Sequence, residues 1–423
     1  MNSISNPLKY PKWSSFAGSL TTETAFDVLA VAKKLKSMGK DVIELQIGDS
    51  PFSSTSHAIR AGMDAIQNGH TRYCPSLGLP SFRETIAKNY HKEFGVSIGP
   101  ENVVIGIGAK VFETYFCELF IEKGDEVLLF NPAFPTFEPN IIRRGGIPVH
   151  SSLRQENDFR PNLDDVHRFI NHSTNPKAIF LNSPHNPTGG VATLDDLQQI
   201  ANMVRGKNIA VFSDEPYCHM VWRGKHQTIL SQQDMLEHTL ACYTFSKSYS
   251  MSGWRLGYAI SSQRNIEMIG KMINTSISCV PPMIQLGGQA ALLEDAAERD
   301  RQMAEFRKKV TILVSEFAKI PEVKIIDPAG TFYVFPNVSA ICNRLKIRSH
   351  GLAMFLLEAA DDHKGVACLG GECFGAAGQG FIRFSCAEPD DRLKQAVDFF
   401  QQAIKSEDRI SKYLEQNPKY RLQ

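Results

Sequence analysis

The feature that most constrains this chain is a series of short apolar runs, each followed by a turn or polar cluster and then by a helical pattern. The runs cover residues 103–107, 126–130, 178–181, 209–213, 240–245 and 256–260. Several are apolar on consecutive residues, which is typical of strands buried on both faces. The pattern therefore predicts an α/β fold in which helices cover a mostly parallel sheet.

The pattern changes near both ends of the chain. A long charged helical stretch runs from about residue 290 to 316, and strand-like segments follow at 323–326, 331–335 and 380–385. Near the start, a helix is expected at 25–37 and a strand at 42–48. We predict a smaller α+β domain built from both ends. The expected division is an N-terminal arm and part of the small domain at 1–56, a large domain at 57–295, the rest of the small domain at 296–406, and a frayed polar tail at 407–423.

Charge and cysteine content exclude several classes of function. The 46 Lys and Arg residues nearly balance the 45 Asp and Glu residues, so no broad field favours nucleic acid or an anionic membrane. The nine cysteines form no CxxC pair and no cluster with zinc-ligand spacing, so no metal site is expected. Scattered thiols, with no export signal and no long apolar segment, predict a cytoplasmic protein.

Polar residues follow the predicted strands at the edge where ligands bind in open α/β sheets. The strand ends supply a lysine (Lys247), a carboxylate (Asp214), a phenol (Tyr217), an amide (Asn186) and an aromatic face (Phe134). Together these groups match the needs of an aldehyde cofactor with a pyridine ring. A lysine directly after an apolar strand is desolvated, which lowers the pKa of its amine and favours imine formation.

Four motifs, in order, carry a resemblance to a known family. The stretch 244–257 resembles the lysine signature of class I and II pyridoxal phosphate-dependent aminotransferases, with Thr244 where that family usually has Gly or Ser. The stretches 182–189, 213–217 and 381–387 resemble its N-x-P-x-N-P-T-G turn, its S-D-E-x-Y strand end and its arginine-bearing C-terminal strand. The resemblance covers residues 25–404. It implies the aspartate aminotransferase-like fold type I, with a seven-stranded sheet and a smaller domain.

The resemblance assigns the ring of pyridoxal 5'-phosphate to a set of residues. Lys247 is expected to hold the cofactor as a Schiff base, and Asp214 to pair with the protonated pyridine nitrogen. Tyr217 and Asn186 are expected to hydrogen-bond the phenolic oxygen of the ring, and Phe134 to stack on its face. Lys247, Asp214 and Tyr217 are therefore the candidate catalytic residues.

The phosphate of the cofactor needs backbone N–H groups and cations. Gly108, Ala109 and Lys110 end a strand and begin a helix, so the positive end of that helix is expected to face the phosphate. The resemblance adds three further residues, Thr244, Ser246 and Arg255. It also adds Tyr73, which in this family reaches the phosphate of the neighbouring subunit, so a homodimer is expected.

The substrate is expected to be held by its α-carboxylate. Arg383 lies in an otherwise apolar strand and offers the planar pair of donors that a carboxylate accepts. Gly48 matches the family glycine that lets the backbone approach the same carboxylate, and Asn186 also contributes to this site.

The implied reaction moves the amino group of an L-amino acid to a 2-oxo acid, with Lys247 serving as nucleophile, base and acid in turn. A pyridoxal phosphate lyase, such as a carbon–sulfur β-lyase, needs the same cofactor residues and is the main alternative. A nicotinamide-dependent dehydrogenase is a remote alternative, because Gly106 and Gly108 imitate a dinucleotide fingerprint but Val111 stands where its third Gly or Ala belongs.

The side-chain specificity is only partly indicated. Lys110 slightly favours an acidic donor such as aspartate or glutamate, because bacterial aspartate aminotransferases of this branch tend to carry a lysine there. The residues at 23–26, Glu-Thr-Ala-Phe, differ from the small polar run of that subgroup. Alanine, aromatic and other donors therefore stay open.

Overall fold

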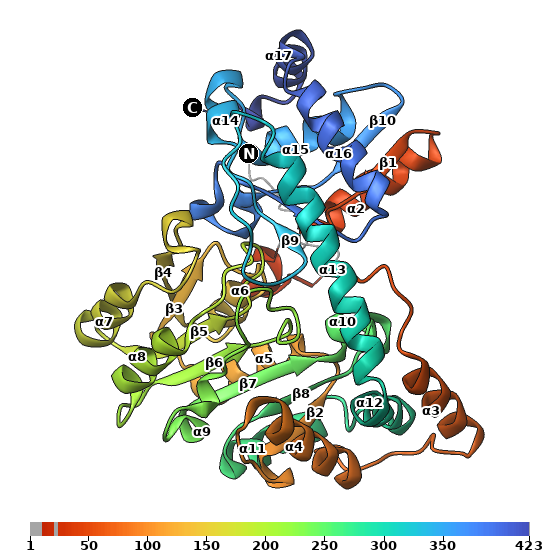
Figure 1. The fold of residues 1–423 in the computed structure, drawn as a ribbon. Coiled ribbons are helices and arrows are strands. Elements are labelled where there is room, and N and C mark those ends of the chain that lie inside the picture. The colour runs from red at the N-terminus through yellow and green to blue at the C-terminus, as the bar shows by residue number, and fades with distance from the viewer. Residues whose placement is uncertain (1–10, 21–23, 423) are drawn as a thin grey trace, which may run out of the picture.

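The computed structural model describes residues 11–20 and 24–422. Figure 1 shows a seven-stranded sheet wrapped by helices, with the blue C-terminal helices and the red β1 and α2 gathered above it. The sheet has the strand order β2-β8-β7-β6-β5-β3-β4. Its strands are β2 Val103–Gly106, β3 Glu126–Asn131, β4 Ile147–Ser152, β5 Pro176–Asn182, β6 Ala210–Asp214, β7 Thr239–Thr244 and β8 Gly257–Ile260. The predicted fold class is confirmed.

All but one of these strands run in the same direction, because only β8 is antiparallel to its two neighbours. The core strand β6 buries every residue and β5 buries residues 178–181, as their consecutive apolar side chains predicted. With this geometry, the carboxyl ends of β5, β6 and β7 lie side by side. Residues directly after these strands are therefore brought to one edge of the sheet.

Helices cover both faces of the sheet. The helices α5, α6 and α11 pack on one face through a cluster that includes Phe116 and Ile269, and α7 and α8 pack on the other through a cluster that includes Val166 and Ile200. The helices around the sheet are α3 Ser56–Gln67, α4 Pro80–Phe94, α5 Lys110–Phe120, α6 Phe137–Arg143, α7 Leu163–His172, α8 Leu194–Val204, α9 Met235–His238, α10 Phe245–Ser248, α11 Gln263–Ser276 and α12 Pro282–Glu294.

Segments from both ends of the chain form a second group of elements. The strand β1 pairs in parallel with β10, so Asp41 lies opposite Lys364. A separate small sheet has the order β11-β12-β9. The strands are β1 Asp41–Glu44, β9 Tyr333–Val334, β10 Lys364–Ala367, β11 Leu369–Gly370 and β12 Ile382–Ser385, and the helices are α1 Ser15–Ser19, α2 Thr24–Ser37, α13 Ala296–Phe317, α14 Ser339–Leu345, α15 Ser349–Glu358, α16 Asp390–Ala403 and α17 Glu407–Gln416.

Three expectations for the C-terminal part of the chain are wrong in detail. The long charged stretch is divided at Asp295, whose carboxylate accepts hydrogen bonds from the backbone N–H groups at the start of α3. The segment 323–326 is not a strand, because only Lys324 makes an isolated bridge. The tail is not frayed through residue 422, because Tyr413 and Leu414 of α17 are buried in a hydrophobic cluster with other C-terminal helices.

Among the described residues, no helix has the length and apolar character needed to cross a bilayer.

Candidate active site

A cavity of about 500 Å³ lies at the carboxyl ends of the central strands. Its wall combines strand-end residues of the large sheet with residues from β12 and from the segment after β1. Most of the residues predicted from sequence line this cavity, namely Gly48, Ala109, Lys110, Phe134, Asn186, Asp214, Tyr217, Thr244, Ser246, Lys247, Arg255 and Arg383. Gly108 does not line the cavity but lies beside Arg255, which does, and Tyr73 lies on the surface.

Lys247 enters the cavity from the short helix α10, which directly follows β7. Its ammonium group donates a hydrogen bond to the backbone oxygen of Gly48 and lies 5.8 Å and 6.0 Å from the ring centroids of Phe332 and Tyr217. A side chain at position 48 would be blocked, because its Cβ would lie 1.8 Å from the hydroxyl oxygen of Tyr333. The glycine therefore allows the segment after β1 to approach the lysine.

Asp214 ends β6, and its carboxylate faces the cavity. Asn182 donates to Oδ2 over 3.1 Å, and the Cys242 thiol donates to Oδ1 over 3.3 Å. Burial raises the pKa of Asp214 to about 7, and the nearby charge of Glu215 acts in the same direction, while the charges of Lys247 and Lys110 oppose it. A cationic partner in the cavity would favour the ionised carboxylate.

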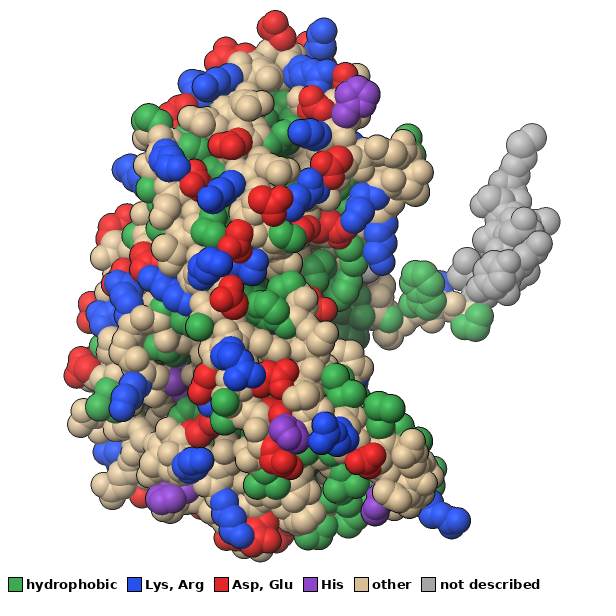
Figure 2. Space-filling view, turned by 45° about the vertical axis from the view of Figure 1, so that its right-hand side comes forward, with side chains coloured by type: hydrophobic (Ala, Val, Ile, Leu, Met, Phe, Trp, Pro, Cys, Tyr) green, Lys and Arg blue, Asp and Glu red, His purple; other side chains and the backbone are tan. Residues whose placement is uncertain are grey.

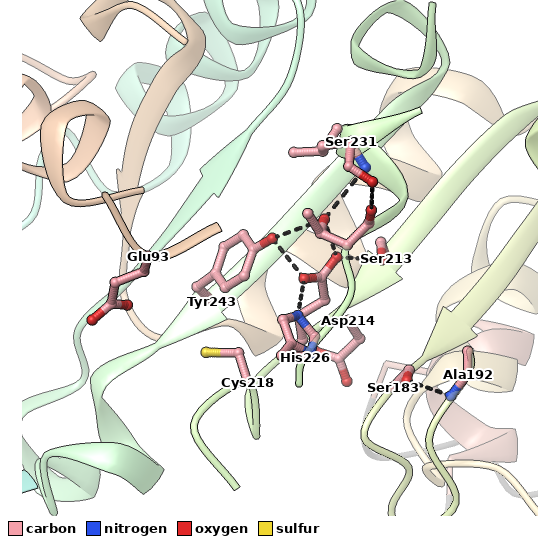
Figure 3. Close-up of polar contacts among 12 residues, drawn as sticks. Glu93, Ser183, Ala192, Ser213, Asp214, Cys218, His226, Ser231 and Tyr243 are labelled. Carbon is pink, nitrogen blue, oxygen red and sulfur yellow. Dashed lines mark hydrogen bonds and ion pairs between the residues drawn. The ribbon is translucent and has the colours of Figure 1, made fainter. Parts of the chain in front are cut away.

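A hydrogen-bond network behind Asp214 fixes the end of β6. Tyr243 and His226 each donate to one oxygen of the Glu215 carboxylate over 2.7 Å, and Ser213 and Thr228 donate to the other over 2.7 Å and 3.0 Å. Figure 3 shows the side chains of Tyr243, His226 and Ser213 converging beside Asp214. Because four donors satisfy this buried carboxylate, it anchors the strand end that carries Asp214.

Two phenols meet on the cavity wall. The hydroxyl oxygens of Tyr217 and Tyr333 are 3.0 Å apart, and burial raises the pKa of Tyr217 well above its usual value. Tyr217 is therefore a neutral phenol that can donate or accept a proton in a hydrogen bond. Tyr333 lies on β9, far along the chain from the strand-end motifs, and sequence reasoning placed it in a strand but not in the site.

Cations, hydroxyls and a helix terminus meet at another part of the wall. Arg255 adopts a left-handed backbone conformation with φ of 56°, and its side chain donates to the backbone oxygen of Ser252 over 2.9 Å. The hydroxyl oxygens of Thr244 and Ser246 are 2.8 Å apart. Gly108 has φ of +82°, and a Cβ there would lie 2.6 Å from the Arg255 guanidinium. The N-terminus of α5 adds its positive dipole, so this region suits a phosphate.

Arg383 reaches the cavity from β12 and is 4% exposed. Its guanidinium lies 4.4 Å and 4.9 Å from the ring centroids of Tyr333 and Phe374. It donates to Asn186 Oδ1 over 2.9 Å and to the backbone oxygen of Gln46 over 2.5 Å. Its Nε has no hydrogen-bond partner among the described residues. A buried cation with an unused donor is a site prepared for an anion.

Two aromatic side chains complete the wall. Phe134, in the segment after β3, has its ring centroid 5.1 Å from the ammonium nitrogen of Lys110. Phe26 of α2 also lines the cavity, together with Ala25. Of the unusual run at 23–26, Glu23 lies outside the described residues. Tyr73 is 89% exposed and does not line this cavity.

These groups fit pyridoxal phosphate. The region around Arg255 and the start of α5 offers cations and N–H donors to a phosphate, and Asp214 offers a buried carboxylate to a protonated ring nitrogen. Lys247 offers an amine to the aldehyde. The unused Nε of Arg383 then remains for a substrate carboxylate.

The remote dehydrogenase alternative does not fit this arrangement. The strand β2, which precedes the candidate fingerprint, lies at the edge of the sheet and beside an antiparallel neighbour. A dinucleotide fingerprint follows a central parallel strand instead. Gly106 and Gly108 are explained by close packing, because a Cβ at Gly106 would lie 2.5 Å from the ring of Phe112.

Comparison with known proteins gives a consistent result. The family model for aminotransferase class I and II matches residues 40–400. The chain is 33% identical over 395 residues to a probable aspartate/prephenate aminotransferase of Aquifex aeolicus, covering 92% of this chain and 98% of the relative. It is 29% identical over 370 residues to aromatic-amino-acid aminotransferase 2 of Thermococcus litoralis, covering 86% and 92%. Aspartate aminotransferase from Thermus thermophilus, solved with maleate, superposes with a TM-score of 0.86 at 26% identity, covering 93% of this chain and 100% of that chain.

Proposed function

Because the chain belongs to the class I and II aminotransferase family, it is a pyridoxal phosphate-dependent aminotransferase, and we propose that its donors include aspartate and glutamate. The observation that carries this donor class is Lys110, a cation on the cavity wall beside Phe134. A second carboxylate on the substrate can pair with this ammonium group. The Thermus thermophilus structure with maleate supports the same class, because maleate carries two carboxylates.

Three residues are proposed to perform the proton and charge chemistry. Arg383 holds the substrate α-carboxylate, using Nε and one terminal nitrogen, and thereby fixes the direction of the Cα–H bond. Lys247 removes the Cα proton and later returns a proton, and its side-chain nitrogen lies in the cavity near the rings of Phe332 and Tyr217. When bound, pyridoxal phosphate supplies an electron sink, and Asp214 keeps the ring nitrogen protonated.

Other residues are proposed to hold the cofactor in place. Arg255, Ser246, Thr244 and the start of α5, with Gly108 and Ala109, bind the phosphate. Phe134 covers one face of the ring and excludes water from it. Tyr217 and Asn186 bond the phenolic oxygen of the ring, and the contact of Asn186 with Arg383 links this oxygen to the substrate site.

Uncharged donors are a second candidate class. Phe26 and Phe134 give the cavity apolar surface that suits an aromatic side chain. The relative from Thermococcus litoralis is named an aromatic-amino-acid aminotransferase. The two classes are compatible, because the reaction admits two different substrates to one cavity in turn.

A panel of L-amino acids tests the donor proposal. The protein is loaded with pyridoxal phosphate and titrated with each amino acid without an acceptor, and conversion of the aldehyde absorbance to that of the amine form is followed. Aspartate and glutamate should convert the cofactor with the highest second-order rate constant of this half-reaction. Release of pyruvate and ammonia with no oxo-acid acceptor would indicate a lyase, and a preference for alanine would contradict the acidic class.

The apolar surface around α3 supports a homodimer. Ile59, Met63 and Ile66 recur at helical spacing on one face of α3 and are 37%, 57% and 55% exposed, and Leu293 of the neighbouring α12 is 64% exposed. In Figure 2, green apolar side chains gather at the lower right, where Figure 1 places α3. We propose that a second copy of the chain covers this face and that Tyr73 of each copy reaches the phosphate site of the other.

Mixed dimers test this arrangement. Tyr73→Ala and Lys247→Ala should each give impaired homodimers, but a hybrid of the two has one site with both residues intact. Subunit exchange should therefore restore about a quarter of the wild-type activity at equal amounts. No recovery after exchange, with dimers verified by sedimentation, would contradict a shared site.

The cysteines support a cytoplasmic location. All nine lie within the described residues and are free thiols. Several are buried, such as Cys242 and Cys386, and burial raises the pKa of both thiols. Unpaired thiols are typical of proteins in a reducing compartment.

A further inference from the structure

A buried carboxylate in the cavity wall has no part in the reaction described above. Glu113 lies in the first turn of α5, is 3% exposed, and lines the cavity together with Lys110. Ionised carboxylates are rarely buried without a compensating charge, because desolvation disfavours the charged form. The placement of this side chain therefore calls for an explanation.

Neutral donors hold Glu113 from behind. The hydroxyl of Thr136 donates to Oε2 over 2.6 Å, and the amide of Asn140 donates to the same oxygen over 3.4 Å. Asn140 is itself fixed, because it donates to the backbone oxygen of Thr136 over 2.9 Å and accepts from Thr114 over 2.9 Å. The bonds from Thr136 and Asn140 both reach Oε2. Thr136 and Asn140 thus orient the Glu113 carboxylate, but neither side chain carries a positive charge.

Lys110 is the nearby cation that can reach Glu113. The two residues are three positions apart on α5, a spacing that places side chains next to each other on one face of a helix. Both line the same cavity, and the ammonium nitrogen of Lys110 lies 5.1 Å from the Phe134 ring centroid. A lysine has four flexible carbons, so its ammonium group can turn toward the helix or toward the substrate.

The proposed reaction creates a charge problem that this pair can solve. An aminotransferase can accept an acidic and an uncharged side chain in one cavity. The acidic side chain needs a cation as its partner, whereas the uncharged side chain leaves such a cation without one. A fixed lysine would be left unpaired and desolvated whenever an uncharged side chain filled the cavity. A carboxylate within reach of the same lysine removes this penalty.

We propose that Glu113 is the alternative counter-ion of Lys110 and thereby lets one cavity accept both acidic and uncharged amino donors. With aspartate or glutamate, Lys110 turns to the side-chain carboxylate of the substrate, and Thr136 and Asn140 continue to hold Glu113. With an uncharged or aromatic donor, Lys110 pairs with Glu113. This inference rests on the proposed function, and it makes Glu113 a residue that determines donor specificity.

Three variants of the holoenzyme test the proposal: Glu113→Gln, Lys110→Met and the double variant. The kcat/KM for aspartate and for phenylalanine is measured with 2-oxoglutarate as the acceptor. Glu113→Gln should lower kcat/KM for phenylalanine by about tenfold and raise it for aspartate, because Lys110 is then left for the acidic substrate alone. Lys110→Met should lower the value for aspartate. The double variant should recover the kcat/KM for phenylalanine, and its kcat/KM for aspartate should stay low.

A matched control distinguishes specificity from stability. Glu118→Gln makes the same change on α5 but outside the cavity wall, where Glu118 lies near Arg143 and Arg144. It should leave the ratio of the two kcat/KM values unchanged. If Glu113→Gln does not fold, Lys110→Met can still contradict the proposal. The proposal requires the kcat/KM of Lys110→Met to fall more for aspartate than for phenylalanine, relative to wild type.

Specific outcomes would overturn the inference. Equal effects of Glu113→Gln on both donors, or no effect on either, would make Glu113 a structural residue. Failure of wild type to accept phenylalanine would remove the dual specificity that the pair explains. Failure of the proposed function is a different result, because wild type would then convert neither aspartate nor glutamate in the spectroscopic titration.

Discussion

The two ends of the cavity are assembled in different ways. At the ring end, Asp214 and Lys247 follow adjacent strands of one sheet, and Asn182 from the next strand holds the carboxylate. At the carboxylate end, Gly48 and Arg383 come from segments 335 positions apart in the sequence, which meet because β12 and the segment after β1 pack together. One end belongs to a single sheet, and the other depends on long-range packing.

The hydrogen bonding differs in the same way. Behind Asp214, the buried Glu215 carboxylate receives four hydrogen bonds, so the ring end is assembled without any ligand. Arg383, by contrast, keeps an unused Nε between two aromatic rings. We therefore expect mutations to separate cofactor binding from substrate binding. Changes at the ring end should affect the chemistry, whereas changes at Arg383 should spare the cofactor.

The largest effect is expected at Lys247. Lys247→Ala removes the group proposed to form the cofactor linkage and to transfer protons, so turnover should fall by more than about 10⁴-fold. The internal imine absorbance should disappear, although the phosphate contacts can still retain some cofactor. Borohydride reduction of the wild type should attach the cofactor to the peptide that contains Lys247. Labelling of another lysine would contradict the assignment of the ring end.

Asp214 gives the next largest effect. Asp214→Ala removes the partner of the protonated ring nitrogen, and kcat should fall by roughly 10³-fold because the electron sink is weakened. Asp214→Glu should keep part of the rate, because it retains a carboxylate. Steady-state kinetics of the two variants, with cofactor content measured by absorbance, provide the test. Near-normal turnover in the alanine variant would show that another acid protonates the ring.

Variants of Arg383 test whether the two ends of the cavity act independently. Arg383→Ala should cost about 3 kcal/mol of transition-state stabilisation, or roughly 150-fold in kcat/KM, because a buried charge loses its partner. Arg383→Lys should also remain impaired, because lysine lacks the planar pair of donors. Cofactor affinity, measured by absorbance titration, should barely change. If the alanine variant instead lost the cofactor and treated amino acids normally, the two ends would not be separable.

The sequence predicted the fold of the large sheet well, because buried strands have a strong local pattern. The apolar runs at 126–130 and 209–213 correspond closely to β3 and β6. The strand β4 was missed because it lies at the sheet edge and keeps several half-exposed or exposed residues. The helix α17 was missed because its sequence is polar, and only tertiary packing buries Tyr413 and Leu414.

The residues of the candidate site also fall into two groups, those that a local sequence pattern predicts and those that only tertiary packing brings together. Asp214 and Lys247 could be found from sequence, because each directly follows a buried strand and lies in a recognisable motif. Tyr333 and Glu113 could not be found, because neither lies in such a motif. Tyr333 is brought to Tyr217 by the pairing of β9 with β12, and Glu113 faces the cavity through the turn of a helix. Contacts between distant segments depend on packing that no local pattern specifies.

The smallest effect concerns the pH dependence of stability in the cofactor-free protein. Burial raises the pKa of Asp214 to about 7 in the folded state, whereas an unfolded chain releases this proton near the ordinary pKa of an aspartate, 3.8. Between these values the folded state binds more protons, so this residue's contribution to stability is present at low pH and is lost as the pH rises toward 7. The slope from this one group is at most about 1.4 kcal/mol per pH unit.

Asp214→Asn should therefore flatten the fall in unfolding free energy between about pH 4 and about pH 7, measured by urea titration at one protein concentration. Arg383→Lys should keep the wild-type slope, because it adds no group that titrates in this range. Parallel curves for wild type and Asp214→Asn would show that the ring end does not hold a proton without its cofactor.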